Sequence, residues 1–154
     1  MTQIYDLPGH QIRRLHQISV AVFAAQTRAA GFDLTPVQYA ALASLRDHPG
    51  IDQATLAGLI AYDRVTIGGV VSRLEARGYL QRKVRDGDRR ARSLTLTERG
   101  ESLLATIQPA VRATQDQLMA GLAPDERDAF MRLLAKLTEA GNHLSRAPFE
   151  GGEA

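Results

Sequence analysis

The sequence contains no cysteine, which excludes disulfide bonds, thiolate metal sites and cysteine-based oxidation sensing. It also has no tryptophan and only 5% aromatic residues, so aliphatic side chains must fill most of the interior, a composition that favours helices packed on helices. No segment approaches the ~20 consecutive apolar residues of a membrane span. The N-terminal segment lacks the apolar core of a secretory signal. A length of 154 residues predicts one domain. Because neither a secretory signal nor a membrane span is found, we expect a cytoplasmic protein without a membrane partner.

Catalytic and metal-binding motifs are missing as well. The four histidines are not spaced with carboxylates as metal ligands are, and no nucleophile motif or phosphate-binding glycine loop is present. We therefore expect no catalytic residue, no metal site and no cofactor, in a protein that is not an enzyme. Turnover of a small aromatic acid would be the observation that favours the enzyme alternative.

Charge is distributed unevenly along the chain. The net charge is only +2, but residues 64–92 include nine cations and three anions, a local net charge of +6. The rest of the chain holds ten cations and fourteen anions, a net charge of −4. A basic segment of this kind is expected where a protein meets DNA phosphates, although a solvated helix face followed by a charged loop gives the same pattern.

Hydrophobic periodicity and capping residues predict a mainly α-helical fold. The expected helices span residues 11–30, 36–47, 53–60, 64–78, 98–120 and 124–144, the fifth with a kink at Pro109. A short helix, a tight turn and a longer helix form the helix-turn-helix pattern. Alternating residues at 79–84 and 92–96 flank a polar loop at 85–91 and predict a basic β-hairpin directly after it. The fold class is therefore mainly α with a small β-hairpin wing, a winged helix-turn-helix.

The first turn of the fourth predicted helix supplies the side chains expected to reach base edges in the major groove. Arg64 can make a bidentate contact with guanine, Thr66 can bond a base or a phosphate, and Ile67 lies in the same turn. Arg73 lies further along this helix, where we expect a phosphate contact.

Two consecutive glycines, Gly68 and Gly69, follow in the same helix. Each costs about 1 kcal/mol relative to alanine inside a helix. Something is therefore expected to approach this helix closely, either a phosphate backbone or a neighbouring helix.

The predicted wing has a different task. Arg89 and Arg90 near its tip are expected to enter a narrow minor groove, whose negative potential attracts guanidinium groups. Arg82 is expected to flank a phosphate. Asp88 is interpreted as structural, because a carboxylate among these cations can orient Arg90 or an arginine of the recognition helix.

The wing sequence resembles the signature of the multiple-antibiotic-resistance regulator (MarR) family, an Asp, any residue, an Arg, a strand ending in Leu-Thr, and a following Gly. Three segments carry the resemblance, in the family's order: LTPVQY at 34–39, LEARGYL at 74–80 and DRRARSLTLTERG at 88–100. The resemblance implies that Arg90 is the minor-groove arginine. It also implies that Arg64, Thr66 and Arg73 lie on the DNA-facing helix.

Helices at both ends of the chain carry apolar stripes that need partners. We expect residues 1–34 and 97–147 to form a helical dimerisation region, residues 35–96 the winged helix-turn-helix DNA-binding lobe, and residues 148–154 a flexible tail. The resemblance likewise implies a homodimer whose N- and C-terminal helices form an intersubunit bundle. A two-fold dimer would read a pseudo-palindromic operator in duplex DNA.

Family members commonly respond to small aromatic acids that release them from DNA, and the resemblance implies a pocket between the first, second and fifth helices. Candidate effector-binding residues there are Arg14, His16, Ser19 and Tyr39, because a carboxylate needs Arg or protonated His and a ring needs an aromatic wall. An interface position for His16 and a core position for Tyr39 are the alternatives. Residues 8–17 (PGHQIRRLHQ) resemble the subgroup that represses degradation of nicotinic acid and related aromatic acids, which suggests a hydroxylated nicotinate.

The sequence thus predicts a ligand-responsive transcriptional regulator, in this family more often a repressor. The alternative is a winged-helix protein-interaction module that does not bind DNA. Salt distinguishes the two, because phosphate binding weakens as the salt concentration rises.

Overall fold

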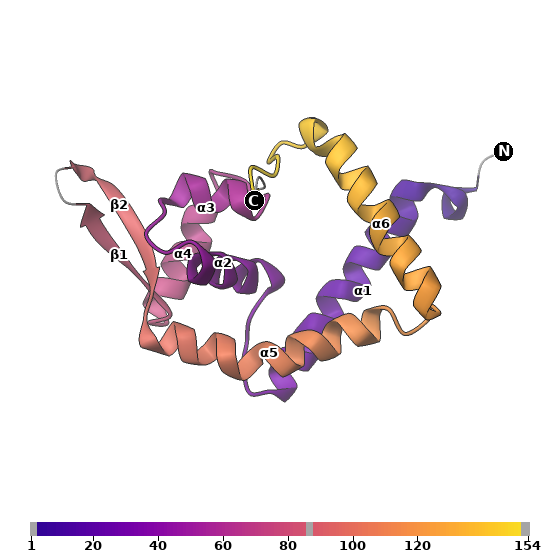
Figure 1. Cartoon of the computed structure of the whole chain (residues 1–154), viewed down its shortest axis with the longest axis horizontal. Coiled ribbons are helices and arrows are strands. Elements are labelled where there is room, and N and C mark those ends of the chain that lie inside the picture. The colour runs from indigo at the N-terminus through magenta and orange to yellow at the C-terminus, as the bar shows by residue number, and fades with distance from the viewer. Residues whose placement is uncertain (1–2, 86–87, 152–154) are drawn as a thin grey trace.

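The structure, a computed structural model, describes residues 3–85 and 88–151, and for residues 85 and 88–91 it describes the backbone only. Helices and one antiparallel hairpin make up the described chain (Figure 1). In order they are η1 (Ile4–Asp6), α1 (Pro8–Ala29), α2 (Pro36–Asp47), α3 (Gln53–Leu59), α4 (Ile67–Ala76), β1 (Leu80–Arg85), β2 (Asp88–Leu96), α5 (Glu98–Leu118), α6 (Pro124–Gly141) and η2 (Asn142–Leu144). The mainly α fold with a β-hairpin wing is confirmed.

Local capping explains the bounds of α2, which are those predicted. The Thr35 hydroxyl accepts from the backbone N–H of Gln38, and the Gln38 side chain accepts from the Thr35 N–H, which forms a capping box. Pro36 occupies the first helical position, where its missing N–H costs nothing. At the other end the sequence His48-Pro49 disfavours further helix.

The lobe that the sequence predicts to bind DNA forms where α2, α3 and α4 pack against the hairpin, which projects at one end of the molecule (Figure 1). Its core includes eight aliphatic side chains with no exposed surface or almost none: Leu42, Leu45, Leu56, Ile67, Val71, Leu74, Leu80 and Leu94. The chain before α3 joins the hairpin edge, since the backbone of Leu94 exchanges hydrogen bonds with Gly50 and Ile51, each 2.8 Å long. The wing is thereby fixed to the helices at its base.

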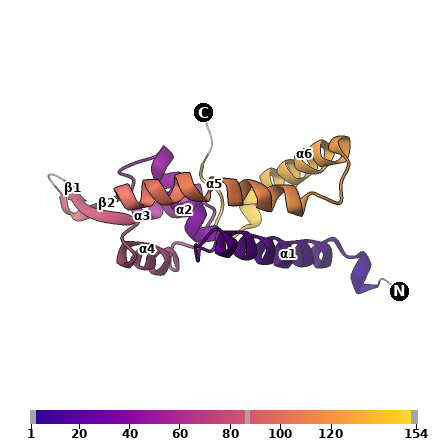
Figure 2. The same cartoon turned by 90° about the horizontal axis from the view of Figure 1, so that it is seen from below.

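The long helix α5 runs from the wing towards the opposite end and packs against α1 (Figure 2). Leu103, Leu104 and Ile107 bury its first half in the core of the lobe. Further along, the side-chain amide of Gln26 in α1 donates to Gln117 in α5 at 2.9 Å. Pro109 lies inside a single continuous helix.

Helix α6 turns back from the end of α5, and none of its residues is buried. Apolar side chains on α1 and α6 are between 39% and 68% exposed: Ile12, Ile18, Met131, Leu133, Leu134 and Leu137. Burying a leucine or isoleucine side chain is worth about 1.5–3 kcal/mol. These two helices therefore present the faces that a partner would cover most favourably.

The described part of the C-terminal tail, residues 148–151, lies against α3. The backbone N–H of Glu150 donates to the carbonyl oxygen of Gly58 at 2.9 Å. The expected flexibility of this tail stays a prediction. The tail is held because the Asn142 side chain bonds both the N–H and the carbonyl oxygen of Phe149. The remainder of the predicted tail, residues 152–154, lies outside the described residues.

Candidate nucleic-acid interface

The turn between α3 and α4 displays three consecutive exposed residues. The Asp63 carboxylate accepts from the backbone N–H groups of Val65 and Thr66, at 2.8 and 3.2 Å. This side-chain-to-backbone turn holds Arg64, 62% exposed in its side chain, and Val65, 90% exposed, outward. Helix α4 consequently begins at Ile67, three residues later than predicted, and Arg64 and Thr66 belong to the turn before it.

The prediction that Ile67 contacts DNA is wrong. Its side chain is fully buried, because it starts the inward stripe of α4 that continues through Val70, Val71 and Leu74. Val65, which the sequence places among the residues expected to reach base edges, is the exposed apolar side chain of this turn. Its position two residues before Ile67, out of phase with that stripe, is the signal that identifies it.

The two glycines of α4 have different neighbours. A Cβ on Gly68 would lie 3.3 Å from the Gln53 side-chain nitrogen, so the first turn of α3 approaches there. A Cβ on Gly69 would lie 3.3 Å from a guanidinium nitrogen of Arg73, which folds back along the exposed face of its own helix. The close approach at Gly68 is therefore made by the neighbouring helix, one of the two alternatives left open by the sequence.

The guanidinium of Arg82, predicted to flank a DNA phosphate, contacts other side chains of the protein. Its guanidinium donates to the Ser72 hydroxyl at 2.9 Å and lies 3.5 Å from the Glu75 carboxylate, and its side chain is only 23% exposed. These contacts link β1, the first strand of the wing, to α4. Arg77 is also structural, since it donates to the carbonyl oxygen of Asp33 at 2.6 Å.

The wing arginines fall at the edge of the described structure. Asp88, Arg89 and Arg90 belong to β2, with Asp88 opposite Arg85 and a register irregularity between Val84 and Arg85. Their side chains, and residues 86–87, lie outside the described part. The roles expected for these three residues stay predictions.

Thr97 joins the wing to α5. Its hydroxyl accepts from the Gly100 N–H at 3.1 Å and donates to the Gly78 carbonyl oxygen at 2.6 Å. Gly78 ends α4 with a φ of +74°, a left-handed conformation that favours glycine. A Cβ on Gly100 would collide with the carbonyl oxygen of Tyr79. Thr97 and Gly100 thus hold the start of α5 close to the turn that joins α4 to β1.

The four effector candidates do not share one face of the fold. Tyr39 in α2 packs against Phe23 in α1, with ring centroids 6.0 Å apart. At about 100° per residue, His16 and Ser19 lie on the same side of α1 as Phe23, whereas Arg14 lies on the opposite side. Arg14 and His16 are exposed, and Ser19 and Tyr39 are half-buried.

None of these four residues lines the hollow at the turn between α3 and α4. This hollow has a volume of about 610 Å³ and is lined by Tyr62, Asp63, Val65, Thr66 and Arg146. Across residues 3–85 and 88–151, no group of three or more acidic or histidine residues is placed to hold a metal ion. No helix in the same residues is long and apolar enough to span a membrane.

The chain is similar to known regulators along most of its length. A MarR-family sequence profile matches residues 32–91. The HTH-type transcriptional repressor NicR of Pseudomonas putida is 38% identical over 132 residues, which cover 86% of this chain and 82% of NicR.

Solved structures agree with this similarity. BpsR of Bordetella bronchiseptica, described with a mechanism for regulation of its DNA binding by 6-hydroxynicotinic acid, has a TM-score of 0.83 at 31% identity, covering 90% of this chain and 97% of that one. The repressor CouR, bound to a 23-mer DNA duplex, has a TM-score of 0.80 at 29% identity, covering 89% of this chain and 96% of that one. The chain therefore belongs to the MarR family of winged helix-turn-helix transcriptional regulators, which act by binding DNA and not as enzymes.

Proposed function

We propose that this chain is a homodimeric repressor that binds a pseudo-palindromic operator in the cytoplasm and is released by a small aromatic carboxylic acid. The observation that carries the proposal is the exposed turn before α4, which presents Arg64, Val65 and Thr66 at one end of an exposed helix face that includes Arg73. A basic wing follows on the next element.

The exposed residues differ in the DNA groups that they can contact. Arg64 fits a guanine edge or a phosphate, Thr66 a phosphate or base, and Val65 the methyl group of thymine. Arg73 fits a phosphate beside the groove. Arg89 and Arg90 remain the proposed minor-groove residues. Asp88 remains the carboxylate proposed to orient Arg90 or an arginine of α4.

Dimerisation is supported by the uncovered faces of α1 and α6. Soluble monomers rarely leave several large aliphatic side chains exposed together on one helix, as α6 does with Met131, Leu133, Leu134 and Leu137. A second copy offers the same two faces by symmetry, so one patch can cover the other. Two DNA-binding lobes would then reach half-sites about 34–36 Å apart, one turn of the DNA.

The effector proposal rests on the named relatives and on α1. DNA binding by BpsR is regulated by 6-hydroxynicotinic acid, and the repressor NicR is similar to this chain over most of its length. A ligand beside Tyr39 would meet Ser19 and His16 on the same side of α1, and protonated His16 can bind a carboxylate. Arg14 lies on the opposite side of α1 from these residues, and its guanidinium stays a proposed partner for the carboxylate.

Fluorescence anisotropy with duplexes from the region upstream of the protein's own gene tests this function. We expect tight binding that weakens with salt and is reversed by 6-hydroxynicotinate. Arg90→Ala should weaken binding by a few kcal/mol at most, while Arg28→Ala, an exposed arginine at the end of α1, should leave it unchanged. Release by an unrelated phenolic acid and not by 6-hydroxynicotinate would refute the nicotinate assignment. Salt-insensitive binding would favour a protein-interaction module.

A further inference from the structure

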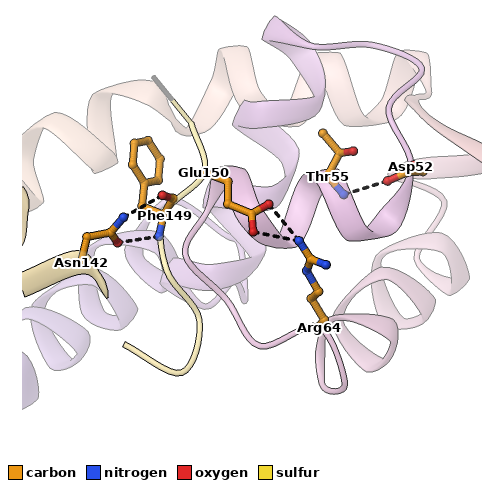
Figure 3. Close-up of polar contacts among 6 residues, drawn as sticks. All are labelled: Asp52, Thr55, Arg64, Asn142, Phe149 and Glu150. Carbon is orange, nitrogen blue, oxygen red and sulfur yellow. Dashed lines mark hydrogen bonds and ion pairs between the residues drawn. The ribbon is translucent and has the colours of Figure 1, made fainter. Parts of the chain in front are cut away.

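The C-terminal segment, residues 142–151, folds back from α6 onto the surface proposed to read DNA. Figure 3 shows Asn142 holding the backbone of Phe149 from both sides, with its Oδ1 accepting from the N–H at 2.7 Å and its Nδ2 donating to the carbonyl oxygen at 2.9 Å. This bracket closes a loop that carries the next residue, Glu150, to α3.

Glu150 is docked by backbone as well as side chain. Its N–H donates to the Gly58 carbonyl oxygen at 2.9 Å. A Cβ on Gly58 would lie 2.9 Å from the Cβ of Glu150, and the three atoms nearest to it all belong to Glu150. The absence of a side chain at residue 58 therefore makes the seat in which Glu150 lies.

The Glu150 carboxylate contacts the arginine proposed to bind DNA. Both of its oxygens accept from the same guanidinium nitrogen of Arg64, at 2.8 and 2.9 Å (Figure 3). The contact joins residues 86 positions apart in sequence. A carboxylate on this guanidinium nitrogen occupies a position that a DNA phosphate oxygen or a guanine acceptor would take.

The rest of the segment stands over the same turn. A smaller hollow of about 130 Å³ lies between the two, lined on one side by Tyr62, Asp63 and Val65 and on the other by Arg146, Ala147 and Pro148. A DNA backbone approaching Arg64 would meet this part of the chain and the negative charge of Glu150.

From this geometry we infer that the C-terminal segment is autoinhibitory: it masks Arg64 with Glu150 and must be displaced before the turn between α3 and α4 engages DNA. The inference rests on the proposed DNA-binding function. The ion pair between Arg64 and Glu150 is weak, because ion pairs between exposed side chains change an equilibrium by at most about fivefold. The segment therefore tunes affinity and does not abolish binding.

Two substitutions release the segment in different ways. Glu150→Gln removes the carboxylate, and Gly58→Ala fills the seat without changing any charge. We expect each to tighten binding to a short random-sequence duplex by about two- to fivefold at low salt. Glu139→Gln, which removes the same charge from an exposed position on α6, is the matched control and should have a smaller effect. Circular dichroism checks that Gly58→Ala leaves α3 folded.

A double-mutant cycle isolates the contact. In an Arg64→Ala background, Glu150→Gln should no longer tighten binding beyond Glu139→Gln, because the guanidinium that it frees is gone. Hydrogen exchange gives a second readout, since the Glu150 amide should be protected in the free protein and lose its protection in the DNA complex.

The outcomes distinguish a failure of autoinhibition from a failure of DNA binding. Equal affinities for wild type, Glu150→Gln and Gly58→Ala, or an amide equally protected with and without DNA, would overturn autoinhibition and leave DNA binding standing. No DNA binding by any of these proteins would refute the proposed function and the autoinhibition with it.

Discussion

Replacing Leu137 in α6 by glutamate should dissociate the proposed dimer. The side chain is 68% exposed in the single chain. Because fully burying a leucine is worth about 1.5–3 kcal/mol, covering the exposed part contributes about 1–2 kcal/mol per copy and about 2–4 kcal/mol per two-fold dimer. Losing that term raises the dimer dissociation constant about 30- to 700-fold, and the cost of desolvating the new carboxylate adds to it.

Sedimentation velocity over a concentration series measures this constant directly. Val65→Glu is the matched control, because it introduces the same charge at an even more exposed position in the turn before α4. It should abolish DNA binding and leave the dimer intact. Circular dichroism should show unchanged helix content for both variants. A wild-type chain that sediments as a monomer at micromolar concentration, or a Leu137→Glu variant with the wild-type constant, would refute the assignment of this face.

Three further substitutions test the local physics. Gly100→Ala should destabilise the fold by at least about 1–3 kcal/mol in urea unfolding, because its Cβ would collide with the Tyr79 backbone; an unchanged midpoint would contradict the tight joint between wing and α5. Thr35→Ala should lower the free energy of unfolding by about 0.5–2 kcal/mol through loss of the capping box with Gln38, and Thr35→Ser should restore most of it. Arg73→Ala should weaken DNA binding similarly for all sequences and flatten the salt dependence by about one phosphate; a change in base preference instead would place Arg73 at a base.

Much of the fold can be predicted from local sequence signals. Helix α2 has the predicted bounds because its start is fixed by a cap, Thr35-Pro36, and its end by His48-Pro49. The wing was recognisable because two alternating strands flank a polar glycine-containing loop. Such features are encoded within a few residues, so no knowledge of packing is needed to read them.

Features set by distant partners could not be read in this way. The sequence predicts a DNA contact for Ile67 because it lies near the N-terminus of the fourth predicted helix, yet its side chain starts the buried stripe of α4. The bonds of Arg82 to Ser72 and Glu75 depend on how β1 lies beside α4. The docking of the C-terminal segment on α3 depends on how the chain after α6 returns to α3, which no local pattern specifies.

Dimeric DNA binding is tested most directly by the salt dependence of operator affinity, measured by anisotropy at a known protein-to-DNA stoichiometry. We expect two chains per operator and a linear fall of log affinity with log salt, at a slope of about −0.9 for each phosphate neutralised. With Arg64, Arg73 and the wing arginines of two copies engaged, that slope should correspond to several phosphates. Affinity that does not change with salt, or saturation at one chain per operator, would contradict the account.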